Sequence, residues 1–334
     1  MAKQKNLQTG CNKITETVFQ INIPHFYQRQ VNVYVLLGNS IILVDTGHLH
    51  KSSFTLLEKV LLDLGLSFKD IKYIIYTHPH IDHLGGGLIL NDLNKEVINV
   101  SYSGSIKIFK NYSQYQGKFV KTSDEFFETK GNGAPCFLIR YAKNFFKNYN
   151  YCPVYKGLAI NIPVEDKEIM KLGDINLEII HTPSHTPWDI SIYEPTDGIL
   201  FTGDFILEKS VSLLSYVTGS DVDNYLSSLK KVKKFDLKII LPGHGKAIEN
   251  PYQAIERSIE NIHWTEDKIL EFLREKSSTA HELTFFLLDR KLSNPVFWYR
   301  YLGMVDTFLT KLLREGKVSQ RTEKGKTVYY TGSR

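Results

Sequence analysis

The sequence predicts a layered α/β domain over about residues 1–254 and a small module of three helices and a β-hairpin over residues 255–334. Three observations support this division. Strand-like and helix-like patterns alternate through the first part, which favours a layered α/β domain. Clusters of polar residues stand directly after several of its apolar strands. The final part instead carries capped helical patterns followed by two short strands.

The first part opens with apolar and alternating segments that predict strands. Gly38 and Asn39 separate two of these segments, and a Gly-Asn pair between apolar runs indicates a β-hairpin. Apolar residues then recur at helical spacing and stop at Gly65, which predicts a helix. In chain order, the predicted strands are 14–23, 31–37, 41–44, 71–76 and 97–100, and the predicted helices are 52–65 and 88–93.

The segment 103–165 differs from its surroundings because it is rich in Tyr, Phe, Asn and Lys. Part of it has a helical pattern, which Gly131-Asn-Gly-Ala-Pro135 interrupts. Its aromatic side chains could form a cap that lines a substrate pocket. Aromatic residues are usually buried in a core, so packing of this insert against the sheet is an equal alternative.

The C-terminal module has a helical pattern at 265–276, and Thr279 to Glu282 forms a capping box that opens a second helix. A third helix is predicted for 297–315 and a hairpin for 318–330. Three helices and a hairpin resemble a winged helix. From Glu256 onward, 14 Lys and Arg against 11 Asp and Glu leave a net charge of +3, which is weak for nucleic acid. Packing against the first domain or a second subunit is therefore at least as well supported as phosphate binding.

Potential metal ligands follow the predicted strand 71–76. Three histidines and a carboxylate lie within six residues in the pattern H-x-H-x-D-H, namely His78, His80, Asp82 and His83. Imidazole and carboxylate groups suit Zn²⁺ and similar divalent ions. We expect the glycines at 85–87 to let the backbone fold tightly beneath these ligands before helix 88–93 begins.

Three further candidates follow later predicted strands: His185 after 175–180, Asp204 after 199–203 and His244 after 237–240. Asp45 also ends a strand, in Val44-Asp-Thr-Gly47. With these residues in order, the sequence resembles the metallo-β-lactamase superfamily over roughly residues 14–250. The five motifs of that family are Asp45, the H-x-H-x-D-H cluster, His185, Asp204 and His244.

The resemblance implies a four-layer αββα sandwich with a dinuclear metal site. One divalent ion is expected on His78, His80 and His185. The other is expected on Asp82, His83 and His244, with Asp204 bridging the two. The family places Asp45 behind the ligands, where it holds the metal loop through hydrogen bonds. Zinc is the first expectation for both ions, with iron or manganese as alternatives.

The resemblance also implies hydrolysis. Two such ions share a water whose pKa can fall from 15.7 to about 7, so a metal-bridging hydroxide is the expected nucleophile. Asp82 could also move the proton. An oxidative di-iron relative would have Glu in place of His80, so hydrolysis is favoured. Some antibiotic-degrading members have Cys where this chain has Asp204, which argues against a true β-lactamase of that type.

Residues that bind the substrate are less defined. In the family, the segment equivalent to 103–165 often lies over the active site, so its residues are candidates. Trp188-Asp189 replaces a common Gly-His, and Ser184 stands where Gly is common before the ligand His. Trp188 could narrow the pocket or be an ordinary core aromatic.

Charge and cysteine content indicate which partners and which compartment suit the protein. The net charge of +5 permits an anionic partner without requiring one. Cys11, Cys136 and Cys152 are scattered without C-x-x-C spacing, which favours a reducing compartment. The polar N-terminus and the lack of a long apolar run predict a cytoplasmic protein that does not enter a membrane.

Three functions agree with these patterns. The first is hydrolysis of an ester, thioester or lactone on a small acyl substrate, because the aromatic insert is neutral and no strongly basic face is evident. The second is an endoribonuclease or phosphodiesterase that acts on single-stranded RNA, favoured by the winged-helix-like module and the positive charge. The third is a non-catalytic regulatory binding protein. A homodimer is compatible with each of them.

Overall fold

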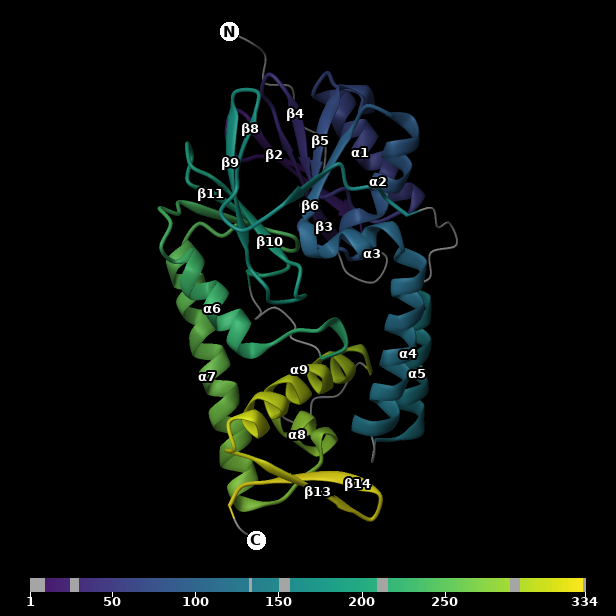
Figure 1. Cartoon of the computed structure of the whole chain (residues 1–334), viewed down its shortest axis with the longest axis vertical. Coiled ribbons are helices and arrows are strands. Elements are labelled where there is room, and N and C mark those ends of the chain that lie inside the picture. Colours follow the sequence, from purple (N-terminus) through teal and green to yellow (C-terminus); the bar gives the residue numbers. More distant parts are fainter. Residues whose placement is uncertain are drawn as a thin grey trace.

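The protein is described from a computed structural model that covers residues 10–24, 30–131, 134–149, 157–208, 216–288 and 295–332. Figure 1 shows two β-sheets in the upper part of the molecule, with helices outside them. Helices from the C-terminal part and a β-hairpin form the lower end. Long helices run along both sides and connect these two ends.

Within the described part of the chain, the first sheet has seven strands in chain order. They are β1 (Cys11–Lys13), β2 (Val18–Pro24), β3 (Gln30–Leu36), β4 (Ile41–Val44), β5 (Ile71–Ile75), β6 (Ile98–Tyr102) and β7 (Ile162–Val164). The hairpin predicted at Gly38-Asn39 is confirmed, since β3 and β4 pair antiparallel. The single strand predicted for 14–23 is wrong, because a turn separates β1 from β2. The Thr15 hydroxyl stabilises that turn by accepting hydrogen bonds from the amides of Thr17 and Val18.

The second sheet has five strands among the residues that the structure describes, in the order β12-β11-β10-β9-β8. They are β8 (Ile169–Leu172), β9 (Ile175–His181), β10 (Ile190–Glu194), β11 (Ile199–Gly203) and β12 (Ile239–Pro242). Neighbouring strands pair antiparallel except β11 and β12, which are parallel. β9, β11 and β12 therefore run in the same direction, and their carboxyl ends reach the same edge of the sheet.

Side-chain alternation along β3 shows how the layers are built. Val33 and Val35 are buried in a core that they share with helices α1 (Lys51–Asp63) and α2 (Ile81–Leu93). Tyr34 and Leu36 point to the other face, into a core shared with the second sheet. A third core joins the second sheet to α6 (Val222–Val232) and α7 (Pro251–Glu275). The layers follow the order helix, sheet, sheet, helix.

The insert forms α3 (Ile106–Lys110), α4 (Tyr112–Lys130) and α5 (Cys136–Tyr149), with the predicted break between the last two. The end of α4 packs on the C-terminal helices: the Phe127 ring lies 6.2 Å from the Trp298 ring and 4.8 Å from that of Tyr299. Lys130 Nζ lies 3.0 Å from the buried Asp306 carboxylate. The aromatic side chains at this end of the insert are therefore packed in a core, but against α9 and not against the sheet as the alternative expected. Residues 150–156 of the insert lie outside the described part of the chain.

The C-terminal part contains α7, α8 (Ala280–Leu287), α9 (Pro295–Arg314), β13 (Ser319–Glu323) and β14 (Lys326–Tyr330). The predicted capping box of Thr279 and Glu282 is confirmed. α7 begins earlier than predicted, with Pro251 in its first turn, so the expected boundary after residue 254 falls inside this helix. The designation of these elements as a winged helix stays a prediction.

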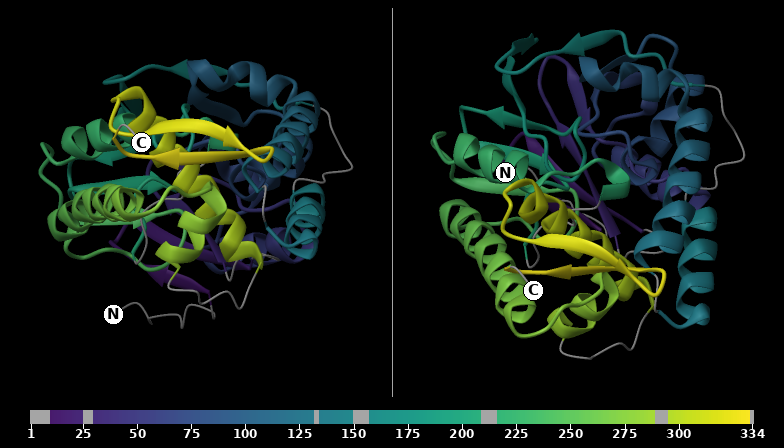
Figure 2. Two further views of the ribbon diagram at one scale, coloured as in Figure 1. Left: turned by 90° about the horizontal axis from the view of Figure 1, so that it is seen from below. Right: turned by 60° about the horizontal axis from the view of Figure 1, so that its bottom comes forward.

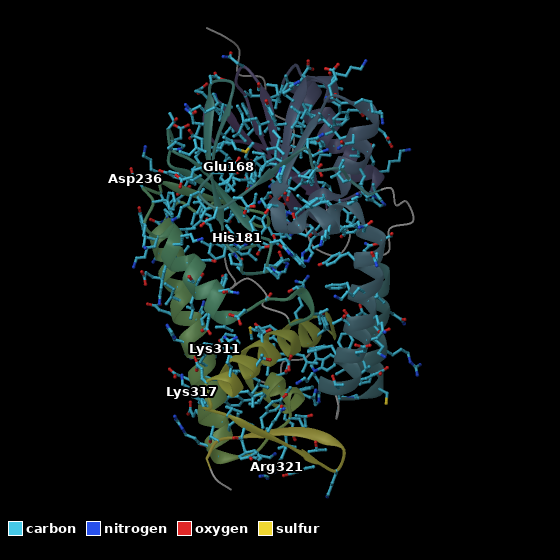
Figure 3. The ribbon with its side chains drawn as sticks, in the orientation of Figure 1. Glu168, His181, Asp236, Lys311, Lys317 and Arg321 are labelled. Atoms are coloured by element: carbon cyan, nitrogen blue, oxygen red, sulfur yellow. The ribbon has the colours of Figure 1, made fainter. Side chains whose placement is uncertain are left out.

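The C-terminal elements share one hydrophobic core with α6 and the insert. Figure 2 shows the hairpin running from the end of α7 toward α4, and Lys130 of α4 donates to the Tyr329 hydroxyl of β14 at 2.8 Å. Lys311, labelled in Figure 3, is buried between Glu266 of α7 and Glu315, at 2.5 and 2.6 Å. These contacts attach the hairpin to α4 and α9 to α7. None of the described helices has the length and apolar character that crossing a bilayer requires.

Candidate metal centre

The H-x-H-x-D-H segment lies at the start of α2, not in an extended loop. His80 is the N-cap of this helix, and Asp82 and His83 are in its first turn. The expected loop at 85–87 and a helix beginning only at 88 are therefore wrong. Interior glycines disfavour a helix by about 1 kcal/mol each relative to Ala, but here they allow a close approach of backbones.

The three glycines face the chain that leaves β4 and β5. A Cβ atom on Gly85 would lie 2.5 Å from the Leu49 amide nitrogen, and one on Gly86 would lie 2.3 Å from the Thr46 carbonyl oxygen. A Cβ on Gly87 would lie 2.0 Å from the Tyr76 hydroxyl. α2 can therefore rest directly on these segments only because its facing residues are glycines.

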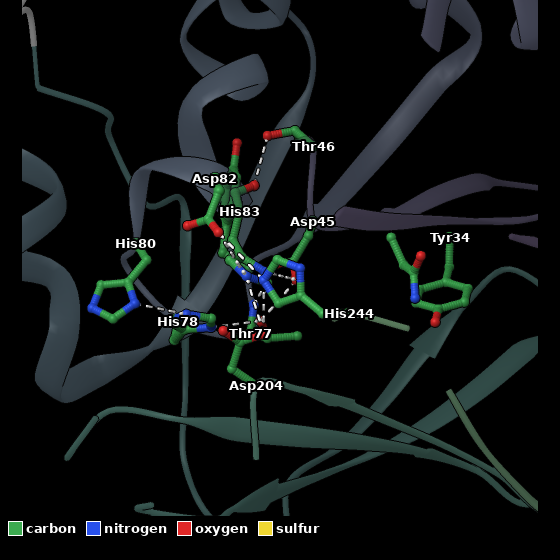
Figure 4. A network of polar contacts seen from close by, with 12 residues as sticks. Tyr34, Asp45, Thr46, Thr77, His78, His80, Asp82, His83, Asp204 and His244 are labelled. Carbon is green, nitrogen blue, oxygen red and sulfur yellow. Dashed lines mark hydrogen bonds and ion pairs between the residues drawn. The ribbon is translucent and has the colours of Figure 1, made fainter. Parts of the chain in front are cut away.

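All the candidate ligands stand at the carboxyl ends of strands. β4 and β5 are parallel, so Asp45 and the segment after β5 emerge at one edge of the first sheet. His185, Asp204 and His244 follow β9, β11 and β12 at the facing edge of the second sheet. Figure 4 shows the side chains from both sheets gathered in one place. The structure thus brings together every ligand candidate predicted from the sequence.

Among the described residues, three overlapping groups of side chains could each hold a divalent ion, because the ligand atoms within a group lie within 4.8 Å of one another. The groups are His78, His80 and His185; His78, His83 and Asp204; and Asp82, His83 and His244. The first and third groups share no residue. Asp204 lies between them, 3.8 Å from His185 Nε2 and 3.3 Å from His83 Nε2.

The ligand atoms of the first group lie slightly closer together than the ligands of a tetrahedral zinc ion do. His80 Nδ1 lies 3.1 Å from His78 Nε2 and 3.0 Å from His185 Nε2. Tetrahedral zinc with bonds of about 2.0–2.2 Å places its ligand atoms roughly 3.3–3.6 Å apart. Burial is the main cause that lowers the pKa of His80, to about 3, with the neighbouring His185 adding to it. Burial lowers the pKa of His78 well below its ordinary value too, so both rings are neutral donors.

The other side of the site is richer in carboxylate. His244 Nε2 lies 3.4 Å from Asp82 Oδ2 and 3.4 Å from Asp204 Oδ1. Burial lowers the pKa of His244, but the nearby carboxylates of Asp204 and Asp82 outweigh it and raise the value to about 10. Burial similarly raises the pKa of Asp204, yet His244 and His83 hold it well below its usual range. The carboxylates of Asp82 and Asp204 therefore favour a cation on this side of the site.

Three buried atoms indicate whether a cation fits this site. His83 Nε2, His244 Nε2 and Asp204 Oδ1 make no hydrogen bond of normal geometry to any described residue. Buried polar atoms rarely lack a partner unless an ion or a ligand supplies one. Imidazole nitrogen and carboxylate oxygen are the donors that zinc, iron and manganese accept. The residues present fit a divalent metal.

Asp45 supports these side chains from behind. Its Oδ2 atom accepts hydrogen bonds from His83 Nδ1 at 2.7 Å and from the Thr77 hydroxyl at 2.8 Å, and Oδ1 accepts from the Thr77 amide at 2.8 Å. Because the proton is on His83 Nδ1, the lone pair on Nε2 faces the site and is available to a metal ion. Asp45 itself has a φ of 59°, a strained value for a residue with a side chain.

We predict that Asp45→Asn weakens metal binding by about 10–100-fold, the range typical of groups that orient metal ligands. An amide retains the size of the side chain but can accept at only one of the two atoms that Thr77 and His83 now use. Titration of the metal-free protein with Zn²⁺ in competition with a chelator measures the change. An unaltered affinity would show that Asp45 does not orient the ligands.

Sequence reasoning missed the residues that hold His244. Its Nδ1 atom donates to the Gln30 carbonyl oxygen at 2.7 Å. Asn32, which is 0% exposed, donates to the carbonyl oxygens of Pro242 and Gly245 at 2.8 and 2.9 Å. A buried Asn within an apolar strand was the one available signal, because these partners lie more than two hundred positions away in the chain.

The loop that carries His185 is fixed by residues that depart from the family pattern. Asp189 is buried and accepts hydrogen bonds from the Ser184 hydroxyl at 2.7 Å and from the Thr186 amide at 2.9 Å. The Thr186 hydroxyl also donates to it. Ser184 and Asp189 thus form one hydrogen-bonded unit across His185. Trp188 in the same loop is partly buried and packs edge-on against Tyr115 of α4.

Comparison with known proteins agrees with this geometry. The chain is similar to a protein of Bacillus subtilis strain 168 named probable metallo-hydrolase YqjP, with 26% identity over 95% of this chain and 98% of that protein. It is also similar to hydroxyacylglutathione hydrolase GloC of Haemophilus influenzae, with 28% identity over 55% of this chain and 71% of that protein.

Among solved structures, the fold matches the metallo-beta-lactamase family protein TTHA1429 of Thermus thermophilus. The TM-score is 0.78 at 21% identity, covering 96% of this chain and all of that one. A family model described as the metallo-beta-lactamase superfamily matches residues 26–244, an interval that begins before Asp45 and ends at His244. The chain therefore belongs to the metallo-beta-lactamase superfamily and is a hydrolase of that superfamily.

Proposed function

We propose that this protein is a dinuclear metal-dependent hydrolase whose substrate is a small acyl ester, and in the first instance an acyl thioester. The observation that carries the proposal is the pair of ligand groups, His78, His80 and His185 against Asp82, His83 and His244, with Asp204 between them. Zinc is the first choice for both ions, with iron or manganese as alternatives.

Two divalent ions at this site would supply Lewis acidity and a water acidic enough to ionise near neutral pH. The side chains around them have separate roles. His78 and His80 are neutral ligand atoms beside His185, whereas Asp204 provides a negative charge that lies near both groups. Asp82 Oδ2, 3.4 Å from His244 Nε2, is placed to move a proton between the attacking water and the leaving group.

The proposed acyl thioester rests on two kinds of support. A hydroxyacylglutathione is an acyl thioester, and a hydrolase of that name is among the similar proteins. Trp188 and the start of α4 supply aromatic surface beside the His185 loop, which suits an apolar acyl chain. The exposed β13 strand supplies little free positive charge for RNA, because Arg321 pairs with Glu323 at 2.5 Å and lies over the Tyr330 ring.

The proposal is tested by assaying acyl thioesters, esters and lactones in parallel with single-stranded RNA, using the wild type and His80→Ala. We expect thioester turnover by the wild type and a loss of at least about 10³-fold in the variant, because His80 is one of three donors to one ion. His263→Ala is the matched control, since this histidine lies on the exposed face of α7. It should retain full activity and metal content.

The alternatives give different results in the same experiment. RNA cleavage that disappears in His80→Ala, without acyl turnover, would replace the thioesterase assignment by a ribonuclease. Fewer than one tightly bound ion per chain, with no turnover after addition of Zn²⁺, Mn²⁺ or Fe²⁺, would support a non-catalytic binding protein. Metal analysis of the wild type distinguishes that last case directly.

A further inference from the structure

One buried hydroxyl group near the His185 loop has no role in the fold described above. Tyr115 lies in the first turn of α4, and its hydroxyl oxygen is buried without a hydrogen bond to any residue in the described ranges. Buried tyrosines usually direct this group to a partner, because leaving it unpaired costs free energy. An unpaired hydroxyl of this kind points to a ligand that supplies the acceptor.

The surroundings of Tyr115 connect it to the metal centre. Its ring packs edge-on against that of Trp188, with ring centres 6.0 Å apart and planes at 80°. Trp188 is three residues beyond His185, in the loop that Asp189 ties together. The backbone amide of Trp188 also donates to the Thr186 hydroxyl at 3.2 Å, so the backbone that carries the indole belongs to the same hydrogen-bonded unit.

Residues before α4 pack on the same loop. The Tyr102 ring stacks on that of His181 at 4.1 Å, and His181 Nε2 bonds to the Pro187 carbonyl oxygen at 2.9 Å. A Cβ atom on Gly104 would lie 3.4 Å from the Trp188 ring. The start of the insert is therefore packed against the loop, which fixes the position of Tyr115 relative to His185.

The chemistry of the hydroxyl makes it a donor. Burial, and to a smaller extent the charge of Asp189, raises the pKa of Tyr115, so the group stays protonated throughout the neutral range. The two Asp189 oxygens already accept from Ser184 and Thr186. The O–H of Tyr115 thus remains available for an oxygen atom that enters from outside the protein.

We infer that the Tyr115 hydroxyl donates a hydrogen bond to an acceptor oxygen of the acyl substrate, with the Trp188 ring packed beside the acyl chain. Tyr115 is then a substrate-binding residue contributed by the aromatic insert. The inference rests on the proposed function. It assigns the first turn of α4 to recognition of the substrate, and the end of the same helix to attachment of the C-terminal part.

The test is Tyr115→Phe, which removes one oxygen atom and keeps the ring that packs on Trp188. On the thioester that the wild type hydrolyses best, we expect KM to rise about 3- to 10-fold with kcat changed less than twofold, because the lost bond holds the substrate and its transition state alike. Tm should stay equal or rise slightly, since no bond within the protein is lost. Metal content should remain that of the wild type.

Tyr193→Phe is the matched control. The Tyr193 hydroxyl donates to the Asp236 carbonyl oxygen at 3.0 Å, at the far end of β10, so this change should lower Tm and leave KM unaltered. If Tyr115→Phe behaves like the control, its hydroxyl serves the fold and the inference is overturned. If the wild type shows no acyl turnover, the proposed function is overturned instead. Turnover by the wild type is therefore measured before the variants are compared.

Discussion

Asp204→Ala is expected to lower kcat/KM for acyl hydrolysis by at least about 10³-fold and to reduce the metal content of the protein. Asp204 lies near both ligand groups, with an oxygen 3.3 Å from His83 Nε2, 3.4 Å from His244 Nε2 and 3.8 Å from His185 Nε2. Its removal takes away the carboxylate that faces imidazoles of both groups and leaves Asp82 as the remaining negative charge beside His83 and His244. We therefore expect weaker binding of both ions rather than of one.

Metal analysis after dialysis checks this result independently of activity. Asp267→Ala is a suitable control because Asp267 is exposed on α7, and it should leave metal content and turnover unchanged. A comparison with His80→Ala separates the two ligand groups, since His80 belongs to only one of them. Loss of a single ion in Asp204→Ala, equal to the loss in His80→Ala, would contradict a bridging position for Asp204.

The candidate ligands could be predicted from the sequence because their chemistry is distinctive and their place in the chain is regular. His78, His185 and His244 each follow an apolar strand, and strand ends that share a direction meet at one edge of a sheet. The family that these residues indicated is confirmed by the match over residues 26–244. Which atom of each side chain faces the site depends on partners that the sequence does not identify.

Two kinds of partner were beyond sequence reasoning. The Gln30 carbonyl oxygen that holds His244 is a backbone atom, and any residue type at that position would supply it. The stacking of Phe127 on Trp298 joins segments about 170 positions apart. An aromatic residue in a helical pattern shows that one face is buried, but not which surface covers it. The sequence therefore does not decide whether the aromatic side chains of the insert line a substrate pocket or pack in a core.

The start of α2 was missed for a different reason. Glycine lets the backbone fold tightly, so the sequence predicts a tight fold at 85–87 and a helix only from residue 88. In the structure, contacts with the ends of β4 and β5 outweigh this local preference, since a glycine is the one residue that fits each position. Substitution of one of these glycines should therefore change the stability of the protein by a large and measurable amount.

Gly86→Ala is expected to destabilise the protein by about 2–3 kcal/mol and to lower Tm by roughly 4–10 °C. The new methyl group would lie 2.3 Å from the Thr46 carbonyl oxygen, which belongs to the backbone and cannot rotate away. Either α2 or the chain after β4 must shift. The Thr46 amide and hydroxyl both donate to the His83 carbonyl oxygen at 2.8 Å, so the shift also displaces a ligand candidate and lowers activity.

Gly117→Ala separates this steric effect from helix propensity. Gly117 also lies inside a helix, α4, but a Cβ atom there has nothing within 4 Å. The same substitution should therefore stabilise the protein by about 0.5–1 kcal/mol, because alanine favours the helix. Thermal unfolding of the two variants should give shifts of opposite sign. If both raise Tm, α2 does not rest on Thr46, and the placement of Asp82 and His83 in its first turn is wrong.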